Sequence, residues 1–189
     1  MMDRQGIINK AVSALNAGGV IIYPTDTIWG LGCDATNPQA IEKLCLVKRR
    51  NPQKSMLILC ADFVQVREYV SCFNEAVVSY VESQPRPTTV VYPKARNLPA
   101  NLVAADGSIG VRVPQSDFCL QLLGKIGKPI VSTSANFSGD VPPVLFADIN
   151  KQLLETVDYV VPSDCNDSRS ACSSQVVKME QDGSFTLIR

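Results

Sequence analysis

The sequence predicts an α/β fold built around a mixed sheet. Segments with the helical spacing of apolar residues alternate with short apolar runs that are typical of strands. The 189 residues, 46% of them hydrophobic, are enough for one sizeable core. No internal repeat or low-complexity linker interrupts the chain, so we expect a single domain over residues 1–189.

The first half of the chain contains four helical and three strand signals. Ile8, Val12 and Leu15 lie on one helical stripe, which predicts a helix over 4–17 before an apolar strand at 20–23. Asn37 as N-cap and Pro38 as the first helical residue predict the next helix. The other elements expected here are a strand at 56–60, a helix capped by Asp62 through Val70, a helix capped by Asn74 through Val81, and a strand at 88–92.

The second half begins with a strand at 108–114 whose period of two separates apolar from polar residues. Ile109 and Val111 face one side, and Ser108 and Arg112 face the other, so the strand directs Arg112 away from the apolar face. The remaining expectations are a helix starting at Ser116, a strand at 129–133, a short helix near 146–154, a strand at 158–161, a polar loop at 163–173, and a hairpin from about 174 to 188 that turns at Asp182-Gly183.

The composition excludes several kinds of chemistry. The chain has no histidine, which excludes Ser-His-Asp and Cys-His nucleophiles and H-E-x-x-H zinc sites. No G-x-x-x-x-G-K-[ST] motif is present, so a standard P-loop NTPase is excluded as well. Phosphoryl and nucleotidyl transfer remain compatible, because they depend mainly on positioning and on stabilising charge on oxygens. The 18 basic and 18 acidic residues balance, which does not favour a broadly basic surface for nucleic acid.

The seven cysteines favour a reducing compartment. No two of them form a C-x-x-C pair, so neither a disulfide framework nor a zinc site is expected, and most are interpreted as buried thiols. The sequence has no apolar run of the length that spans a bilayer and no recognisable secretory signal. We therefore expect a cytoplasmic protein without a membrane association.

Small polar clusters follow the predicted strands and helices. They are Thr25-Asp26-Thr27, the basic segment 48–54, Ser108 with Arg112, Ser132 to Asn136, and Ser173-Ser174 leading to Arg189. Each cluster alone also has a structural explanation, as a turn, a helix cap, a solvated helix end or an ion pair. Together, hydroxyls and cations at strand ends favour a site for a triphosphate and a small polar co-substrate.

Four of these segments carry motifs of a known family. The motifs are Y-P-T-D-T-x-x-G-L-G-x-D-A at 23–35, K-x-R-x-x-x-K at 48–54, G-V-R-V-P at 110–114, and S-T-S-A-N-x-S-G at 132–139. In order and spacing they resemble the YrdC/TsaC family of threonylcarbamoyl-AMP synthases. The resemblance runs from about residue 8 to the end and fits the short, single-domain form.

The resemblance implies both a fold and a reaction. The implied fold is a twisted, largely open mixed sheet flanked by helices around a concave, positively charged groove. Such enzymes condense L-threonine, bicarbonate or CO2, and ATP into threonylcarbamoyl-AMP and pyrophosphate, with Mg2+ expected alongside ATP and no dedicated protein metal site. Transferase proteins then modify adenosine 37 of tRNAs, and some family members bind RNA.

The resemblance also assigns roles to individual residues. Contact with ATP is implied for Arg50, Lys54, Ser108, Ser134 and Arg189. Contact with threonine is implied for Thr27, Arg112, Ser132 and Ser174. Lys48, Arg50 and Asn136 are the expected catalytic residues, and Lys48, Arg50 and Lys54 would neutralise the triphosphate. Asp26 is expected to hold Lys48 or Arg50 in place or to assist Mg2+.

A second function stays open from the sequence. The superfamily includes YciO-like paralogues, in which a basic groove would bind RNA or tRNA without making an adenylate. The joint presence of Lys54, Ser134, Asn136 and Arg189 favours the use of ATP.

Overall fold

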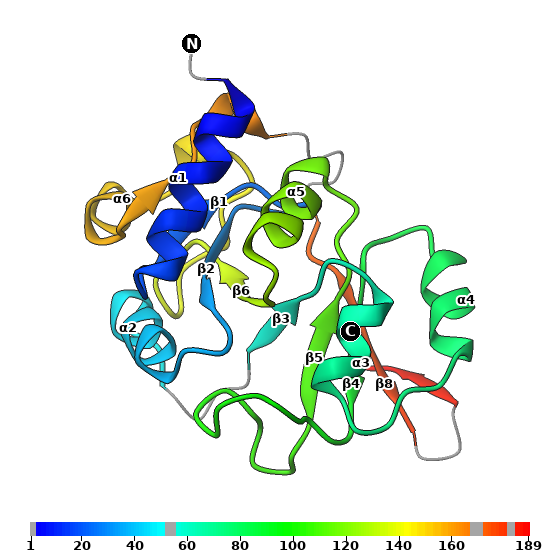
Figure 1. Ribbon diagram of the computed structural model, residues 1–189. Coiled ribbons are helices and arrows are strands. Elements are labelled where there is room, and N and C mark those ends of the chain that lie inside the picture. The colour runs from blue at the N-terminus through cyan, green and yellow to red at the C-terminus, as the bar shows by residue number, and fades with distance from the viewer. Residues whose placement is uncertain (1–2, 52–55, 167–171, 181–183) are drawn as a thin grey trace.

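A nine-stranded mixed sheet forms the centre of the computed structural model, which describes residues 3–51, 56–166, 172–180 and 184–189 (Figure 1). Its strands are β1 (Ile21–Tyr23), β2 (Gly30–Asp34), β3 (Leu57–Leu59), β4 (Thr88–Tyr92), β5 (Ile109–Arg112), β6 (Ile130–Ser134), β7 (Tyr159–Val160), β8 (Gln175–Met179) and β9 (Phe185–Leu187). Their order is β7-β1-β2-β6-β3-β5-β4-β8-β9. The pairs β1/β7, β3/β5 and β4/β8 are parallel and the others antiparallel, so the expected open, mixed sheet is confirmed.

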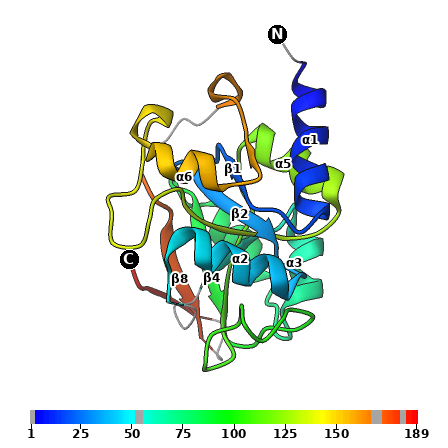
Figure 2. The same cartoon turned by 90° about the vertical axis from the view of Figure 1, so that its left-hand side faces the viewer.

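The helices cover the two faces of this sheet unequally. They are α1 (Arg4–Asn16), α2 (Pro38–Lys48), α3 (Phe63–Tyr69), α4 (Ala76–Glu82), α5 (Asp117–Ile126) and α6 (Lys151–Thr156), with 3-10 turns at Phe146–Asp148 and Ser163–Cys165. Helices α2, α3, α4 and α6 pack into the larger core on one face, where α2 and α6 lie in front of the strands (Figure 2). On the other face α1 and α5 build a smaller core with β1 and with single residues of β3 and β6.

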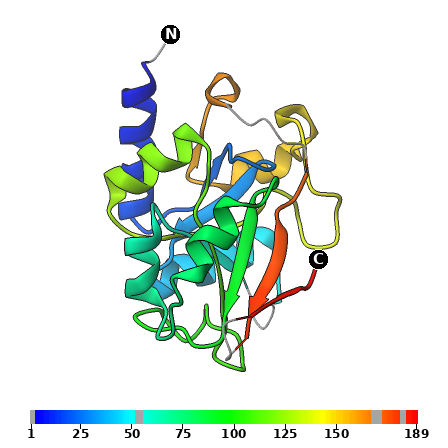
Figure 3. The ribbon, with the colours of Figure 1, turned by 90° about the vertical axis from the view of Figure 1, so that its right-hand side faces the viewer.

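The smaller core stops short of one side of the sheet. Among the described residues, β4, β5 and β8 contribute no buried apolar side chain to it. Helix α1 and the C-terminus lie on opposite sides of the molecule (Figure 3). Part of the second face is therefore left without a helical cover, and small or polar side chains occupy it.

Side-chain caps begin the helices where the sequence predicts them. The Asn37 carboxamide oxygen accepts hydrogen bonds from the first turn of α2, and Pro38 is the first helical residue. Asp62 caps α3 and Ser116 caps α5 in the same way. Asn74 accepts from the backbone N–H of Ala76, the residue at which α4 begins.

The main difference from the sequence prediction is β2. No strand was expected at Gly30 and Gly32, since glycine is depleted in strands, but this segment forms a fully buried strand between β1 and β6. The expected helix near 146–154 is divided into a 3-10 turn and α6. The turn at 182–183 and residues 167–171 of the expected loop lie outside the described residues.

The cysteines agree with the sequence interpretation. All seven are free thiols, and the buried ones are Cys33, Cys45, Cys60, Cys119 and Cys165. Burial raises the pKa of the Cys33 and Cys60 thiols, which keeps them protonated and inert. Within the part of the chain that the structure describes, no helix has the length and apolar character needed to cross a membrane.

Candidate active site

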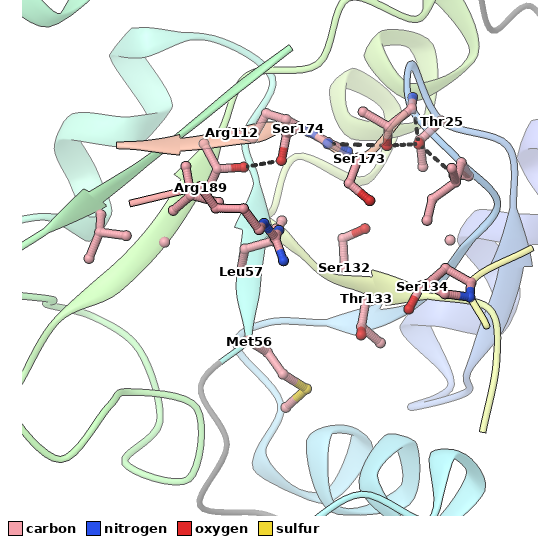
Figure 4. Close-up of a pocket in the computed structure, with 18 of the residues that line it drawn as sticks. Thr25, Met56, Leu57, Arg112, Ser132, Thr133, Ser134, Ser173, Ser174 and Arg189 are labelled. Carbon is pink, nitrogen blue, oxygen red and sulfur yellow. Dashed lines mark hydrogen bonds between the residues drawn. The ribbon is translucent and has the colours of Figure 1, made fainter. Parts of the chain in front are cut away.

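A pocket of about 490 Å³ lies on the uncovered part of the sheet (Figure 4). Its floor is made by alternate residues of neighbouring strands, among them Thr89, Gly110 and Ser132. The residues between them, such as Val90 and Val111, point into the larger core on the opposite face. The volume is in the range of small-molecule sites, and the side chains that line it are mainly hydroxyls and arginines.

Most of the residues predicted from the sequence meet in this pocket. Those that line it are Thr27, Arg50, Ser108, Arg112, Ser132, Ser134, Ser174 and Arg189. They come from segments spread over most of the chain, which only the sheet order brings together. Lys48 and Asn136 do not line the pocket, and Lys54 lies outside the described residues. The described lining residues include three arginines and no aspartate or glutamate side chain.

Arg112 is held at the end of β5 by charged and hydroxyl groups. Its Nη2 lies 3.3 Å from Asp26 Oδ1, an ion pair in which both side chains are more than nine-tenths buried. Its Nη1 donates to Thr27 Oγ1 at 3.2 Å, and the Arg112 Nε–H finds no hydrogen-bond acceptor among the described residues. A buried, unsatisfied donor on a guanidinium is costly, so this arginine is prepared to receive an anionic group such as a carboxylate.

Hydrogen bonds define the direction of the hydroxyl proton in each of the two threonines beside Arg112. Thr25 Oγ1 donates to the carbonyl of Ile28 at 2.7 Å, which uses its only proton. The 2.9 Å contact between the hydroxyls of Thr25 and Thr27 is therefore donated by Thr27 (Figure 4). Thr27 Oγ1 is consequently an acceptor on its remaining side, where Arg112 reaches it.

Asp26 has a different partner from the two that were expected, and its expected assistance to Mg2+ stays a prediction. Its carboxylate pairs with Arg112 and accepts from the backbone N–H of Gln115 at 3.1 Å, instead of holding Lys48 or Arg50. Burial explains why Asp26 pairs with Arg112, because the Arg112 side chain is only 4% exposed and its charge needs a nearby counter-charge. Asp26 therefore acts on the site through Arg112.

Ser174 is positioned by a residue that the sequence analysis did not single out. Its hydroxyl lies 2.8 Å from Thr89 Oγ1, and both side chains are buried and line the pocket. Thr89 belongs to a predicted strand, and the period of two already places Thr89 and Val91 on one face. The sequence alone does not show that this face is the polar one. The pairing of β4 with β8 shows it, because Ser174 directly precedes β8.

Lys48 lies beneath the pocket instead of at a solvated helix end. It is only 2% exposed, and its Nζ donates to the carbonyl oxygens of Ser134 and Asn136 and to Asn136 Oδ1. Burial and the neighbouring Arg50 charge lower the pKa of Lys48 to about 8. The Asn136 amide in turn donates to Phe137 and Asp140 carbonyls. Lys48 thus ties the end of α2 to the segment after β6.

The outer part of the pocket carries the better-solvated cations. Arg50 follows the C-cap residue of α2 and is half-buried, and Arg189, the last residue of the chain, is exposed. The backbone N–H of Arg189 donates to Val176 on β8 at 3.2 Å, which fixes the C-terminal segment beside the pocket. Two arginines at a water-accessible rim are suited to phosphate oxygens, which they contact through bidentate hydrogen bonds.

An open sheet with a histidine-free pocket of arginines and hydroxyls at its strand ends is typical of α/β proteins that bind a small anionic ligand. The family model Sua5_yciO_yrdC, described as "Telomere recombination", matches residues 13–189. The chain belongs to this Sua5/YciO/YrdC family, as its motifs indicated.

Curated relatives agree with this family, and solved structures share the fold. A threonylcarbamoyl-AMP synthase of Pseudoalteromonas translucida is 35% identical over 85% of this chain and 87% of its own, and one of Blochmanniella pennsylvanica is 39% identical over 74% and 73%. The structure of P. abyssi Sua5 complexed with L-threonine superposes with a TM-score of 0.88 at 22% identity, and this chain spans 55% of it. E. coli YciO superposes with a TM-score of 0.78 at 24% identity, covering 100% of this chain and 90% of its own.

Proposed function

We propose that the protein is an L-threonylcarbamoyladenylate synthase, which makes threonylcarbamoyl-AMP and pyrophosphate from L-threonine, bicarbonate or CO2, and ATP. The observation that supports this most is the convergence of eight predicted site residues from distant segments on one polar pocket. The synthase names of relatives at 35% and 39% identity point to the same reaction. Because the strands of one sheet and the segments that flank them supply the described pocket residues, we also propose that residues 1–189 act as a single domain.

The buried residues would hold threonine. Arg112 offers the unsatisfied Nε–H to the carboxylate, with its charge partly balanced by Asp26. Thr27 presents an acceptor, since its proton is donated to Thr25, and so fits the amine or hydroxyl of the substrate. Ser132 and Ser174 complete this part of the pocket.

The better-solvated residues would hold ATP. Arg50 and Arg189 carry charge for the phosphates, and Ser108 and Ser134 add hydroxyl donors. Lys54, in the K-x-R-x-x-x-K motif, belongs to this proposal through the resemblance alone. Lys48 and Asn136 would contribute by fixing Ser134, because the Lys48 ammonium is bonded to the Ser134 and Asn136 carbonyls.

The reaction needs no covalent enzyme intermediate. The neutral threonine amine adds to CO2 and releases a proton to water, which gives a carbamate. A carbamate oxygen then attacks the α-phosphorus of ATP while pyrophosphate leaves. Arg112 and Thr27 orient the amino acid, and Arg50 and Arg189 stabilise charge on the phosphate oxygens. Holding both substrates in one cavity supplies much of the acceleration by proximity.

Mg2+ would arrive with the nucleotide. The described residues contain no group of three or more carboxylate, imidazole or thiol side chains that could hold a metal, and hydroxyls dominate the lining of the pocket. We therefore assign its coordination mainly to phosphate oxygens and water, where it would reduce the negative charge of the triphosphate.

The product would be passed to other proteins. We propose that threonylcarbamoyl-transferase partners use it to modify adenosine 37 of tRNAs, and that this takes place in the cytoplasm, where ATP and tRNA are abundant. The competing function is that of a YciO-like protein that binds RNA or tRNA without forming an adenylate.

Pyrophosphate release tests the proposal. Purified protein with ATP and bicarbonate should release pyrophosphate when L-threonine is added, and much less with L-serine or L-valine. Arg112→Ala should abolish the threonine-dependent release, whereas Arg67→Ala, which removes an exposed ion pair with Glu75, should not. Absence of release together with absence of ATP binding would reject the synthase, and a salt-dependent tRNA titration would then test the RNA-binding alternative.

A further inference from the structure

Tyr23 reaches the pocket from beneath, across a neighbouring strand. It is the last residue of β1, fully buried, and its hydroxyl donates to Ser132 Oγ at 2.9 Å. Ser132 belongs to β6, and β2 lies between β1 and β6 in the sheet. The phenol ring must therefore pass over β2 to make this hydrogen bond.

Two glycines of β2 leave the space for the ring. A Cβ at Gly32 would stand 2.9 Å from Tyr23 Cε1 and 2.4 Å from the carbonyl oxygen of Val131. A Cβ at Gly30 would stand 3.3 Å from the same ring. The register pairs Gly30 with Tyr23 and Gly32 with Ser132, so the glycines lie directly along the path of the side chain.

The direction of this hydrogen bond decides what Ser132 can do. Because Tyr23 donates, the bond occupies a lone pair of Ser132 Oγ and leaves the Ser132 proton for another acceptor. Burial raises the pKa of Tyr23, so the phenol keeps its proton over the whole physiological range. Ser132 lines the pocket close to Ser134, where a ligand oxygen can receive that proton (Figure 4).

We propose that Tyr23 is a positioning residue for amino-acid binding: through the channel formed by Gly30 and Gly32 it orients the Ser132 hydroxyl as a donor to an oxygen of the bound amino acid. This inference rests on the proposed function, in which Ser132 contacts threonine. It explains why the Y-P-T-D-T-x-x-G-L-G motif combines a tyrosine with two glycines, since the glycines leave the space through which the tyrosine reaches Ser132.

Calorimetric titration of L-threonine tests the proposal. Tyr23→Phe keeps the ring and removes the donor, and it should raise the threonine Kd by about 3- to 10-fold, the effect of one hydrogen bond. The KM for ATP should change by less than about twofold. In a Ser132→Ala background, Tyr23→Phe should have no further effect on threonine, a result that general loosening of the fold would not produce.

Tyr92→Phe is the matched control. Tyr92 is equally buried in the same sheet but lies in the larger core on the other face, so its variant should bind threonine like the wild type. Wild-type affinity in Tyr23→Phe, or additive losses in the double variant, would overturn the inference. Failure of the wild type to bind threonine would instead reject the proposed function.

A second measurement leaves Tyr23 unchanged. The chain has five tyrosines, so labelling with 13Cζ-tyrosine gives a simple spectrum. Removal of the acceptor in Ser132→Ala should shift one tyrosine signal, and L-threonine should shift the same signal in the wild type. If no tyrosine signal responds to Ser132→Ala, the hydrogen bond does not operate and the inference is wrong.

Discussion

The pocket contains a buried group, Thr27, Arg112, Ser132 and Ser174, and an outer group, Arg50, Ser108, Ser134 and Arg189. Every member of the buried group is at most 5% exposed, whereas the outer group ranges from half-buried to exposed. Buried polar atoms require fixed partners, so the first group is arranged before a ligand binds. The outer cations remain hydrated and are screened by salt. The difference suits a small, rigid amino acid in one place and a long, flexible triphosphate in the other.

The largest effect is expected from removing the central charge of the buried group. Arg112→Ala leaves Asp26 buried without its partner, which should lower the free energy of unfolding by about 3–5 kcal/mol. The kcat/KM for threonine should fall by roughly 1000-fold, equivalent to about 4 kcal/mol. Denaturant unfolding and steady-state kinetics measure the two effects.

The control for Arg112 is an exposed arginine. Arg67→Ala removes an ion pair with Glu75 of 2.6 Å, and it should change stability by less than about 1 kcal/mol and leave the kinetics unchanged. Arg112→Lys should recover part of the stability but little activity, since an ammonium lacks the planar fork. If Arg67→Ala and Arg112→Ala lose stability and activity equally, burial does not distinguish the two arginines.

Lys48 links the buried interior to the outer group, so its removal should affect ATP more than threonine. Lys48→Met keeps the length of the side chain but leaves the Ser134 and Asn136 carbonyls without their donor. We expect the KM for ATP to rise by roughly 10- to 100-fold, as for loss of charged hydrogen bonds, with the threonine Kd nearly unchanged. Lys43→Met, at an exposed position of the same helix, is the control. A larger change for threonine than for ATP would contradict the assignment.

The lowered pKa of Lys48 predicts a specific pH dependence of stability. The pKa is about 8 in the folded protein against 10.5 for the free side chain, so the unfolded chain binds this proton more tightly. The destabilising contribution of Lys48 is then complete below pH 8 and is relieved between pH 8 and 10.5, with a slope of at most about 1.4 kcal/mol per pH unit. The unfolding free energy of the wild type minus that of Lys48→Met should therefore rise with pH in this window. A flat difference would mean that Lys48 stays protonated throughout.

A smaller effect is expected in the outer group. Arg189→Ala should raise the KM for ATP by about 5- to 10-fold without a change in melting temperature, because the side chain is exposed. The loss should shrink when the ionic strength is raised from about 0.05 to 0.5 M, since screening already weakens this contact. Lys178→Ala, on strand β8 beside the C-terminal segment, should have no effect on ATP. If the rise in the KM for ATP does not depend on salt, Arg189 behaves like a member of the buried group.

The sequence was informative where local rules determine structure. The caps Asn37 and Asp62 correctly predicted where two helices begin. The period of two around Arg112 correctly predicted the direction of its side chain. The sequence failed at β2, because a glycine-rich strand is favoured only once the Tyr23 ring crosses it. It also failed to show the burial of Lys48, which depends on carbonyls 86 and 88 residues away. Long-range partners of this kind have no local signature.

The smallest effect tests whether a hydroxyl behind the buried group matters at all. Thr89→Val keeps the shape of the side chain but removes the 2.8 Å hydrogen bond to Ser174, so the threonine Kd should rise by about 2- to 5-fold. The neighbouring Thr88 is also buried, but its hydroxyl bonds Arg86 and Gln175 and does not line the pocket. Thr88→Val should therefore reduce stability without altering threonine affinity. If Thr89→Val and Thr88→Val bind threonine with equal affinity, packing alone positions Ser174. Thr27, Arg112 and Ser132 are then the members of the buried group that polar partners hold in place before the ligand binds.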